Sequence, residues 1–189
     1  MTEEQILDAF RETGALLEGH FILRSGKHSR QFFQCALLLE HAKLMERLCG
    51  ELVQKVEGLK FDRVISPALG GLFVGQEMAR QLGRRHIFVE KADTGKLALR
   101  RGFTIDRGEK FLVCEDVATE GGRVIETMEI VENHGAEVAG VALFVDRSTT
   151  MLDFECPTVS LLKLPVKTFE PGHLPADLKK IPAVKPGSK

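Results

Sequence analysis

Short apolar runs alternate with helical stretches through the middle of the chain, and this alternation restricts the fold more than any other feature. The runs of strand length are residues 64–65, 87–89, 111–114 and 138–145. Between them, apolar side chains recur at helical spacing over about 72–82 and 122–133. Such alternation predicts an α/β fold, in which a mostly parallel sheet carries helices on both faces and binds its ligand at the carboxyl ends of the strands.

Further elements precede this alternating region. Thr2 and Gln5 have the spacing of a capping box, and the apolar positions that follow predict a helix reaching about Gly19. Residues 21–39 break into short apolar pieces around polar residues, which favours a hairpin or small hood. Helical spacing then returns over about 41–56.

The length of the chain suits one substantial domain. We expect residues 1–189 to form a single unit with its core at about 41–150. A small hood, built mainly from about 1–40 with the C-terminal tail, should lie beside that core. The tail after Cys156 is rich in Pro and Lys, and we expect it to wrap the surface.

Composition excludes several classes of protein. A formal net charge of −1 gives no general attraction to nucleic acid or to an anionic membrane, so any anion site must be local. No apolar run approaches the roughly 20 residues of a membrane span, and the acidic start lacks the pattern of a secretory signal. We therefore expect a cytoplasmic protein. The four cysteines lack zinc-site spacing and are expected to be buried free thiols, while stacking on a ligand must use Phe or His because Trp and Tyr are absent.

The segment 111–123 carries the most informative chemistry. After the apolar run, Glu115 and Asp116 supply carboxylates, which accept hydrogen bonds from the two neighbouring hydroxyls of a ribose. The residues that follow can wrap a phosphate, because glycines permit a tight backbone and amides at the start of a helix favour an anion. The predicted ribose and phosphate residues are Glu115, Asp116, Val117, Ala118, Thr119, Glu120, Gly121, Gly122 and Arg123. The alternative is an ordinary turn in which Asp116 or Thr119 caps the helix.

This order of apolar strand, acidic pair and Thr/Gly-rich loop resembles the type I phosphoribosyltransferase family. The resemblance implies phosphoribosyl pyrophosphate as a substrate. It also implies Mg²⁺, held by the diphosphate, sugar and water more than by protein side chains, so no protein metal ligand is predicted. Two residues depart from the family pattern. Glu120 replaces a small or hydroxyl residue, and Arg123 stands where Ser or Thr is common.

Other segments are similar to the orotate phosphoribosyltransferase family, and together they cover most of the chain. The matching segments are Gly19–Ser29, Phe32–Gln34, Ser66–Gly71, Val145–Arg147 and Val184–Ser188. The resemblance implies a hood entry near Arg24, which is expected to help fix the base or the phosphate. It also implies backbone amides for the pyrophosphate at Gly70 and Gly71, and contact of Thr119 with the base.

An anionic pyrimidine such as orotate needs a cation for its carboxylate and an apolar surface for its ring. Arg147 offers the first, and Phe32 or Phe33 offers the second. A salt bridge with Asp146 is the alternative for Arg147, and a place in the hydrophobic core is the alternative for one of the two phenylalanines.

Residues 91–108 are predicted to form a mobile basic loop. Its predicted site residues are Lys91, which should bind phosphoribosyl pyrophosphate, and the catalytic cations Lys96, Arg100 and Arg101. These charges can neutralise the departing pyrophosphate, although a solvated charged hairpin is the alternative. In the resembled family, such a loop reaches the neighbouring subunit's site, which implies a homodimer with a shared active site.

The sequence therefore predicts transfer of ribose 5-phosphate from phosphoribosyl pyrophosphate to orotate, a step of pyrimidine biosynthesis. Its partners would be these two small molecules, with no nucleic acid and no membrane. Two alternatives stay open, namely a phosphoribosyltransferase for another base and a non-catalytic sensor of the same fold. Glu120 is the feature that favours the sensor.

Overall fold

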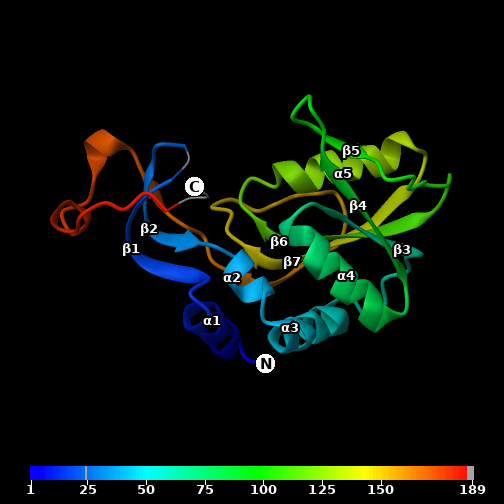
Figure 1. The fold of residues 1–189 in the computed structure, drawn as a ribbon, viewed down its shortest axis with the longest axis horizontal. Coiled ribbons are helices and arrows are strands. Elements are labelled where there is room, and N and C mark those ends of the chain that lie inside the picture. The colour runs from blue at the N-terminus through cyan, green and yellow to red at the C-terminus, as the bar shows by residue number, and fades with distance from the viewer. Residues whose placement is uncertain (24, 187–189) are drawn as a thin grey trace.

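A computed structural model describes residues 1–23 and 25–186, and it confirms the predicted α/β class (Figure 1). Within these residues, a six-stranded sheet has the order β5-β4-β3-β6-β7-β8. Its strands are β3 (Arg63–Pro67), β4 (Arg85–Lys91), β5 (Leu97–Leu99), β6 (Lys110–Ala118), β7 (Glu137–Asp146) and β8 (Thr158–Lys163). All neighbours are parallel except β4 and β5, which form an antiparallel pair. The parallel strands therefore present their carboxyl ends along one edge, where a ligand site was predicted.

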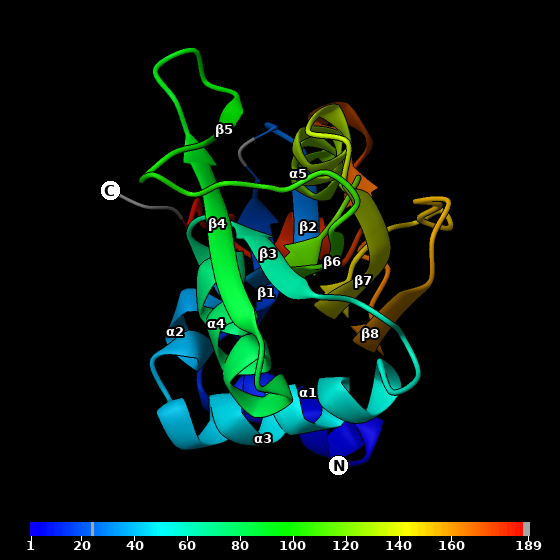
Figure 2. The ribbon, with the colours of Figure 1, turned by 90° about the vertical axis from the view of Figure 1, so that its right-hand side faces the viewer.

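Helices cover both faces of this sheet because the central strands are apolar on both sides. Along β6, Leu112 and Cys114 pack with α1 (Glu3–Glu12), α3 (Ala42–Lys55) and α4 (Gly70–Leu82). Phe111 and Val113 point to the opposite face and pack with α5 (Gly122–Asn133). Figure 2 shows α3 and α5 on opposite sides of the strands. No helix in the described part of the chain is both long and apolar enough to cross a bilayer.

The predicted hairpin is present and forms the centre of a second, smaller sheet. Its strands are β1 (Leu16–Ile22), β2 (His28–Phe33) and β9 (Thr168–Phe169), in the order β1-β2-β9. The C-terminal segment runs over this sheet through the short 3-10 turns Pro171–His173 and Leu178–Lys180. Arg30 donates two hydrogen bonds of 2.8 Å to Asp177, and Val184 bridges to Phe21. We call this small sheet with its C-terminal covering the hood, and it lies to the left of the central sheet in Figure 1.

Two expectations about the ends of the chain were wrong. The first helix ends at Glu12 and not near Gly19, since Gly14 takes a left-handed φ of +71° and Leu16 pairs with Phe33 in the hairpin. The segment after Cys156 does not only wrap the surface. It supplies β8, which pairs with β7 at the edge of the central sheet and lies beyond the predicted core boundary at 150. How the chain divides into hood and core stays a prediction in its finer bounds.

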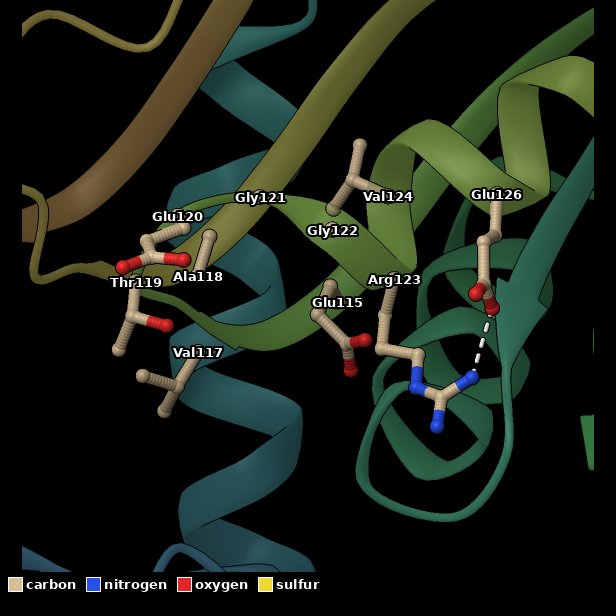
Figure 3. Close-up of a pocket in the computed structure, with 10 residues that line it drawn as sticks. All are labelled: Glu115, Val117, Ala118, Thr119, Glu120, Gly121, Gly122, Arg123, Val124 and Glu126. Atoms are coloured by element: carbon tan, nitrogen blue, oxygen red, sulfur yellow. Dashed lines mark hydrogen bonds and ion pairs between the residues drawn. The ribbon is translucent and has the colours of Figure 1, made fainter. Parts of the chain in front are cut away.

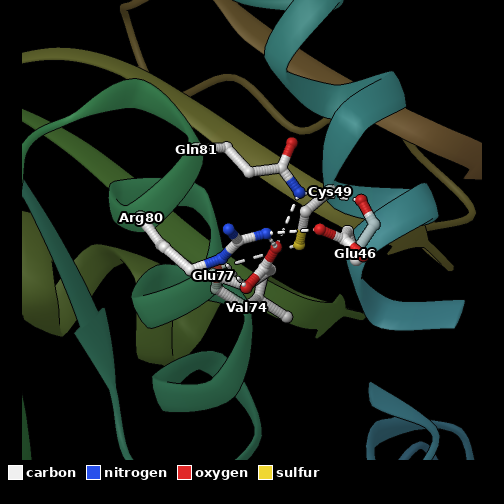
Figure 4. Close-up of polar contacts among 6 residues, drawn as sticks. All are labelled: Glu46, Cys49, Val74, Glu77, Arg80 and Gln81. Carbon is white, nitrogen blue, oxygen red and sulfur yellow. Dashed lines mark hydrogen bonds and ion pairs between the residues drawn. The ribbon is translucent and has the colours of Figure 1, made fainter. Parts of the chain in front are cut away.

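Between α3 and α4 lies a group of polar contacts that holds the two helices together (Figure 4). Arg80 bonds to Glu46 at 2.8 Å and to Glu77 at 2.7 Å, and Gln81 donates to the carbonyl of Glu46. Cys49 lies beneath them and is fully buried. As predicted, all four cysteines are free thiols, but Cys156 is only half-buried.

Candidate active site

The acidic pair lies where β3 and β6 separate. β3 pairs with β6 only as far as Ile65 and Val113, whereas β6 continues beside β7 to Ala118. Glu115 and Asp116 are therefore still inside a strand, not beyond its end as the sequence suggested. Their position leaves one side of the strand open for the loop that leads from β3 into α4.

Two glycines of that loop press directly on the carboxylates. A Cβ added to Gly70 would lie 2.3 Å from Oδ2 of Asp116, and one added to Gly71 would lie 2.7 Å from Oε1 of Glu115. Both distances are far below a normal contact, so a larger residue at either position would displace the acidic pair. The predicted pyrophosphate loop and the predicted ribose residues thus form one close-packed unit.

Burial controls the protonation of this pair. Burial raises the pKa of Glu115 well above its ordinary range, and the neighbouring Asp116 charge adds to the rise. Backbone amides of Asp116 and Gly71 oppose it by donating to Glu115. Burial also raises the pKa of Asp116, against hydrogen bonds from Glu115 and from the Val117 amide. Both carboxyl groups are therefore harder to ionise than exposed ones until a ligand supplies hydrogen-bond donors.

A cavity of about 370 Å³ opens between the end of β6 and the start of α5 (Figure 3). We call it the β6–α5 cavity, and it is lined by Glu115, Val117, Ala118, Thr119, Glu120, Gly121, Gly122, Arg123, Val124 and Glu126. Gly121 immediately precedes α5 and has a φ of +74°, a conformation that favours glycine. The first amides of α5 and the positive end of its dipole suit an anion at this point.

The two residues that depart from the family pattern lie on different sides of the loop. Arg123 reaches along α5 and bonds to Glu126 at 2.6 Å. Figure 3 shows the Glu120 carboxylate beside Thr119, on the other side from Arg123.

A second cavity, of about 600 Å³, lies between the hood and the strand ends. We call it the hood-facing cavity, and its lining residues are Phe33, Gln34, Cys35, Ala36, Leu39, Glu40, Leu69, Gly70, Phe73, Asp116, Val117 and Arg147. Since Glu115 lines the first cavity and Asp116 the second, the acidic pair stands between them. A ribose held by this pair could direct its 5′-phosphate into one cavity and its base into the other.

Arg147 is the cation of the hood-facing cavity. Its guanidinium carbon lies 4.5 Å from the centre of the Phe33 ring. Its Nε is buried and, within the described residues, has no hydrogen-bond partner. Burial lowers the pKa of Arg147 from its usual value. The predicted alternative of a pair with Asp146 is not realised, because Asp146 accepts from Ser148 and lies near Lys163. Arg147 is thus available to an anionic ligand.

Several predicted site residues lie elsewhere. Phe32 packs against Phe21 with ring centres 5.9 Å apart, so Phe33 is the one of the pair that lines the cavity. In the described chain, neither cavity is lined by Lys91, Lys96, Arg100 or Arg101. Arg101 is bound instead to Glu90 at 2.9 Å, and Arg100 lies 3.6 Å from the same carboxylate. Arg24 lies outside the described residues.

Sequence reasoning missed some lining residues. Leu69 and Phe73 are largely exposed apolar side chains beside the hood-facing cavity, and Cys35 lies within it, next to Arg147. Burial raises the pKa of the Cys35 thiol, which keeps it neutral. Leu69 and Phe73 could have been found from their places beside Gly70 and Gly71, which were already predicted to belong to the site. The position of Cys35 depends on how the hood docks.

Known proteins share both the sequence and the fold. The family described as phosphoribosyl transferase domain matches residues 38–175. An orotate phosphoribosyltransferase of Desulforamulus reducens is 47% identical over 189 residues, covering 100% of this chain and 98% of the relative. That of Caldicellulosiruptor bescii is 48% identical, covering 100% and 99%.

Solved structures agree on the fold. Orotate phosphoribosyltransferase from Aeropyrum pernix matches with a TM-score of 0.69 and 23% identity, over 84% of this chain and 93% of that one. Adenine phosphoribosyltransferase from Thermoanaerobacter pseudethanolicus matches with a TM-score of 0.62 and 22% identity, over 71% and 88%. Because enzymes named for different bases share it, the fold alone does not choose the base. The full-length sequence similarity and the matched domain together show that this chain belongs to the phosphoribosyltransferase family, in its orotate phosphoribosyltransferase branch.

Proposed function

We propose that this chain transfers ribose 5-phosphate from phosphoribosyl pyrophosphate to N1 of orotate, giving orotidine 5′-monophosphate and pyrophosphate. The observation that carries the proposal is Arg147, a half-buried side chain in the cavity next to Asp116 whose buried Nε has no hydrogen-bond partner among the described residues. An anionic base supplies the carboxylate that this cation lacks. The 47–48% identity to orotate phosphoribosyltransferases over the whole chain supports the same base.

The reaction requires little covalent chemistry from the protein. N1 of orotate attacks C1′ while the bond from C1′ to the pyrophosphate oxygen breaks, and pyrophosphate leaves with the electron pair. The proton of N1 passes to the departing pyrophosphate or to water. Both reacting groups belong to the substrates, so the chain contributes positioning and stabilisation of charge. In this proposal, Glu115 and Asp116 hold the ribose hydroxyls, and residues 117–123 hold the 5′-phosphate. The amides of Gly70 and Gly71 meet the pyrophosphate, and the Gly71 amide exchanges its hydrogen bond to Glu115 for one to the substrate.

Mg²⁺ belongs to the proposal as a companion of the substrate. Its chemistry is to neutralise the diphosphate, and it prefers oxygen ligands and retains water. Among the described residues, no group of three or more His, Cys, Asp or Glu side chains converges. The acidic pair next to the proposed pyrophosphate loop suits an ion bound mainly through the substrate, with the carboxylates ordering the ribose hydroxyls.

We also propose that the active unit is a homodimer in which the basic segment 91–108 serves the partner's site. The β4–β5 hairpin projects beyond the rest of the sheet in Figure 2, and its cations line neither cavity of their own chain within the described residues. Mixing Glu115→Gln protein with Lys96→Ala/Arg100→Ala protein should restore activity, because a mixed dimer contains one intact site. Two inactive variants that stay inactive when mixed would contradict a shared site.

The test of the function is an assay with phosphoribosyl pyrophosphate, Mg²⁺ and one base at a time. We expect release of pyrophosphate with orotate and not with uracil, xanthine or guanine. Turnover of another base would correct the specificity. Binding of phosphoribosyl pyrophosphate without turnover of any base would instead indicate a sensor, the alternative that the carboxylate of Glu120 favours. A cytoplasmic location is part of the proposal and is tested by cell fractionation.

A further inference from the structure

The turn that forms the β6–α5 cavity rests on a side chain far along the sequence. A Cβ added to Gly121 would lie 2.8 Å from both Cε1 and Cζ of Phe154 and 3.5 Å from Cδ2 of Leu152. Phe154 is only 6% exposed and belongs to the apolar cluster beneath α5. The edge of its ring therefore touches the backbone of Gly121, on the side away from solvent.

This contact comes from a segment that is tied to the cavity at both ends. The amide of Arg147, which begins the segment, donates to the carbonyl of Ala118 at 2.8 Å. Asp146 fixes the same end by accepting from the amide and hydroxyl of Ser148. The segment then returns to place Phe154 behind Gly121. Residues 118–121 are thus held at one end by the hydrogen bond to Ala118 and at the other end by the Phe154 ring against Gly121.

Besides Phe154, the turn is supported by the Ile125 amide, which donates to the Gly121 carbonyl at 2.9 Å, and by the more distant Leu152. Phe154 makes the tightest of these contacts. Cavities of about 450 and 420 Å³ are both lined by Asp153, Phe154 and Cys156. Gly121 has no side chain of its own, and its φ of +74° is easily changed in glycine. We infer that packing of Phe154 against Gly121 helps to hold the conformation in which the first amides of α5 face the cavity.

We propose that Phe154 is a positioning residue for the 5′-phosphate, acting through Gly121 without touching the substrate. This inference rests on the proposed function only in taking the β6–α5 cavity as the phosphate site. Removing the ring should let the Gly121 turn relax and misdirect the amides that meet the phosphate. The base site should be spared, because Arg147 keeps its own contacts with Phe33 and Ala118.

The test compares Phe154→Ala with Phe61→Ala as a matched control. Phe61 is 7% exposed, belongs to the cluster on the other face, and lies just before β3 at the opposite end of the strands. Calorimetric titration with phosphoribosyl pyrophosphate and Mg²⁺, without a base, measures binding in the absence of turnover. We expect Kd to rise roughly tenfold for Phe154→Ala and to stay within twofold for Phe61→Ala, while both variants lose thermal stability.

A second variant protects the test against misfolding. Phe154→Leu keeps most of the apolar volume and should recover most of the affinity. In steady-state assays of Phe154→Ala, KM for phosphoribosyl pyrophosphate should rise, while KM for orotate changes less than twofold. Equal affinity in Phe154→Ala and wild type, or an equal loss in both alanine variants, would overturn the inference. Failure of the wild-type protein to bind phosphoribosyl pyrophosphate would instead overturn the proposed function.

Discussion

Two pairs of carboxylates in this molecule have opposite environments. Glu46 and Glu77, between α3 and α4, share Arg80 and are partly exposed (Figure 4). Glu115 and Asp116, between the two cavities, have no Lys or Arg within salt-bridge distance in the described chain. Hydrogen bonding to Arg80 lowers the pKa of Glu77, whereas burial raises that of Glu115. A structural cluster satisfies its own charges, whereas a binding site leaves them to be satisfied by a ligand.

The largest effect should come from neutralising Glu115. We expect Glu115→Gln to lower kcat/KM about 100-fold or more, because a charged acceptor for the ribose is lost. The same change should raise the free energy of unfolding by about 1 kcal/mol at pH 8, since it removes a buried charge without a cationic partner. Enzyme assays and urea denaturation measure the two quantities.

Glu77→Gln is the matched control, and it should reverse the effect on stability. It removes a carboxylate that Arg80 stabilises, so the free energy of unfolding should fall by roughly 0.5 kcal/mol at neutral pH. The value of kcat/KM should stay within twofold of wild type. If Glu77→Gln stabilised the protein, or Glu115→Gln destabilised it, the two pairs would not differ as described.

Arg147 extends the comparison to cations. Arg80 has two carboxylate partners, whereas the Nε of Arg147 is buried without one in the described residues. We expect Arg147→Ala to raise KM for orotate by about 100-fold, because a buried charge-assisted contact with the base is lost. KM for phosphoribosyl pyrophosphate should change less than threefold. Arg80→Ala is the control and should leave both constants unchanged; an equal rise in both KM values for Arg147→Ala would contradict a role confined to the base.

The features that sequence predicted best are those encoded by neighbouring residues. The helix expected over about 122–133 occupies Gly122–Asn133. Residues 115–123 line one cavity apart from Asp116, which lines the other, while their roles toward ribose and phosphate stay a prediction. Both features depend on the spacing of residues within one continuous segment, which can be seen in the sequence. β5 and β8 were missed, because short strands at a sheet edge have little apolar pattern of their own and form by pairing with β4 and β7.

The site residues that escaped prediction depend on contacts between distant segments. Cys35 lines a cavity because the hood docks against the strand ends, and Phe154 meets Gly121 because the segment after β7 folds back. The residues next to Cys35 or Phe154 in the sequence do not indicate which distant segment each of them contacts. The sequence also could not tell whether Phe32 or Phe33 lines the cavity. Alternation along β2 predicts that the two side chains point to opposite faces of the strand, but not which face meets the cavity.

Two groups near α4, the half-buried His86 and the buried Glu115, should give stability opposite dependences on pH. Burial lowers the pKa of His86 to about 4, and its ring bonds to Ser66 at 2.7 Å. The unfolded chain takes up a proton near pH 6.5 and the folded chain does not, so stability falls as pH drops below that value. The loss should reach about 2 kcal/mol at pH 5 and level off below pH 4. Glu115 acts in the opposite direction: because burial raises its pKa, stability is lost as pH rises from the unfolded carboxyl pKa to the folded one.

Urea denaturation across pH separates the two groups. His86→Gln keeps a polar side chain near Ser66 and should flatten the acid side of the stability curve. Glu115→Gln should reduce the loss of stability that accompanies rising pH. The opposite assignment of the two limbs, or no change in either, would show that other groups govern the pH dependence.

Glu120 shares one property with each carboxylate pair. Like Glu46 it is exposed, and like Glu115 it has no ion-pair partner within the described residues. An exposed charge is screened by water and salt, so its repulsion of a phosphate should be weak. We expect Glu120→Thr to lower KM for phosphoribosyl pyrophosphate by about twofold to threefold at low salt, and the gain should vanish at high salt. Glu129→Thr, the same substitution farther along α5, should leave KM unchanged. Equal KM values for Glu120→Thr and wild type at low salt would show that the Glu120 carboxylate faces away from the phosphate, and this residue would then cease to favour a sensor over an enzyme.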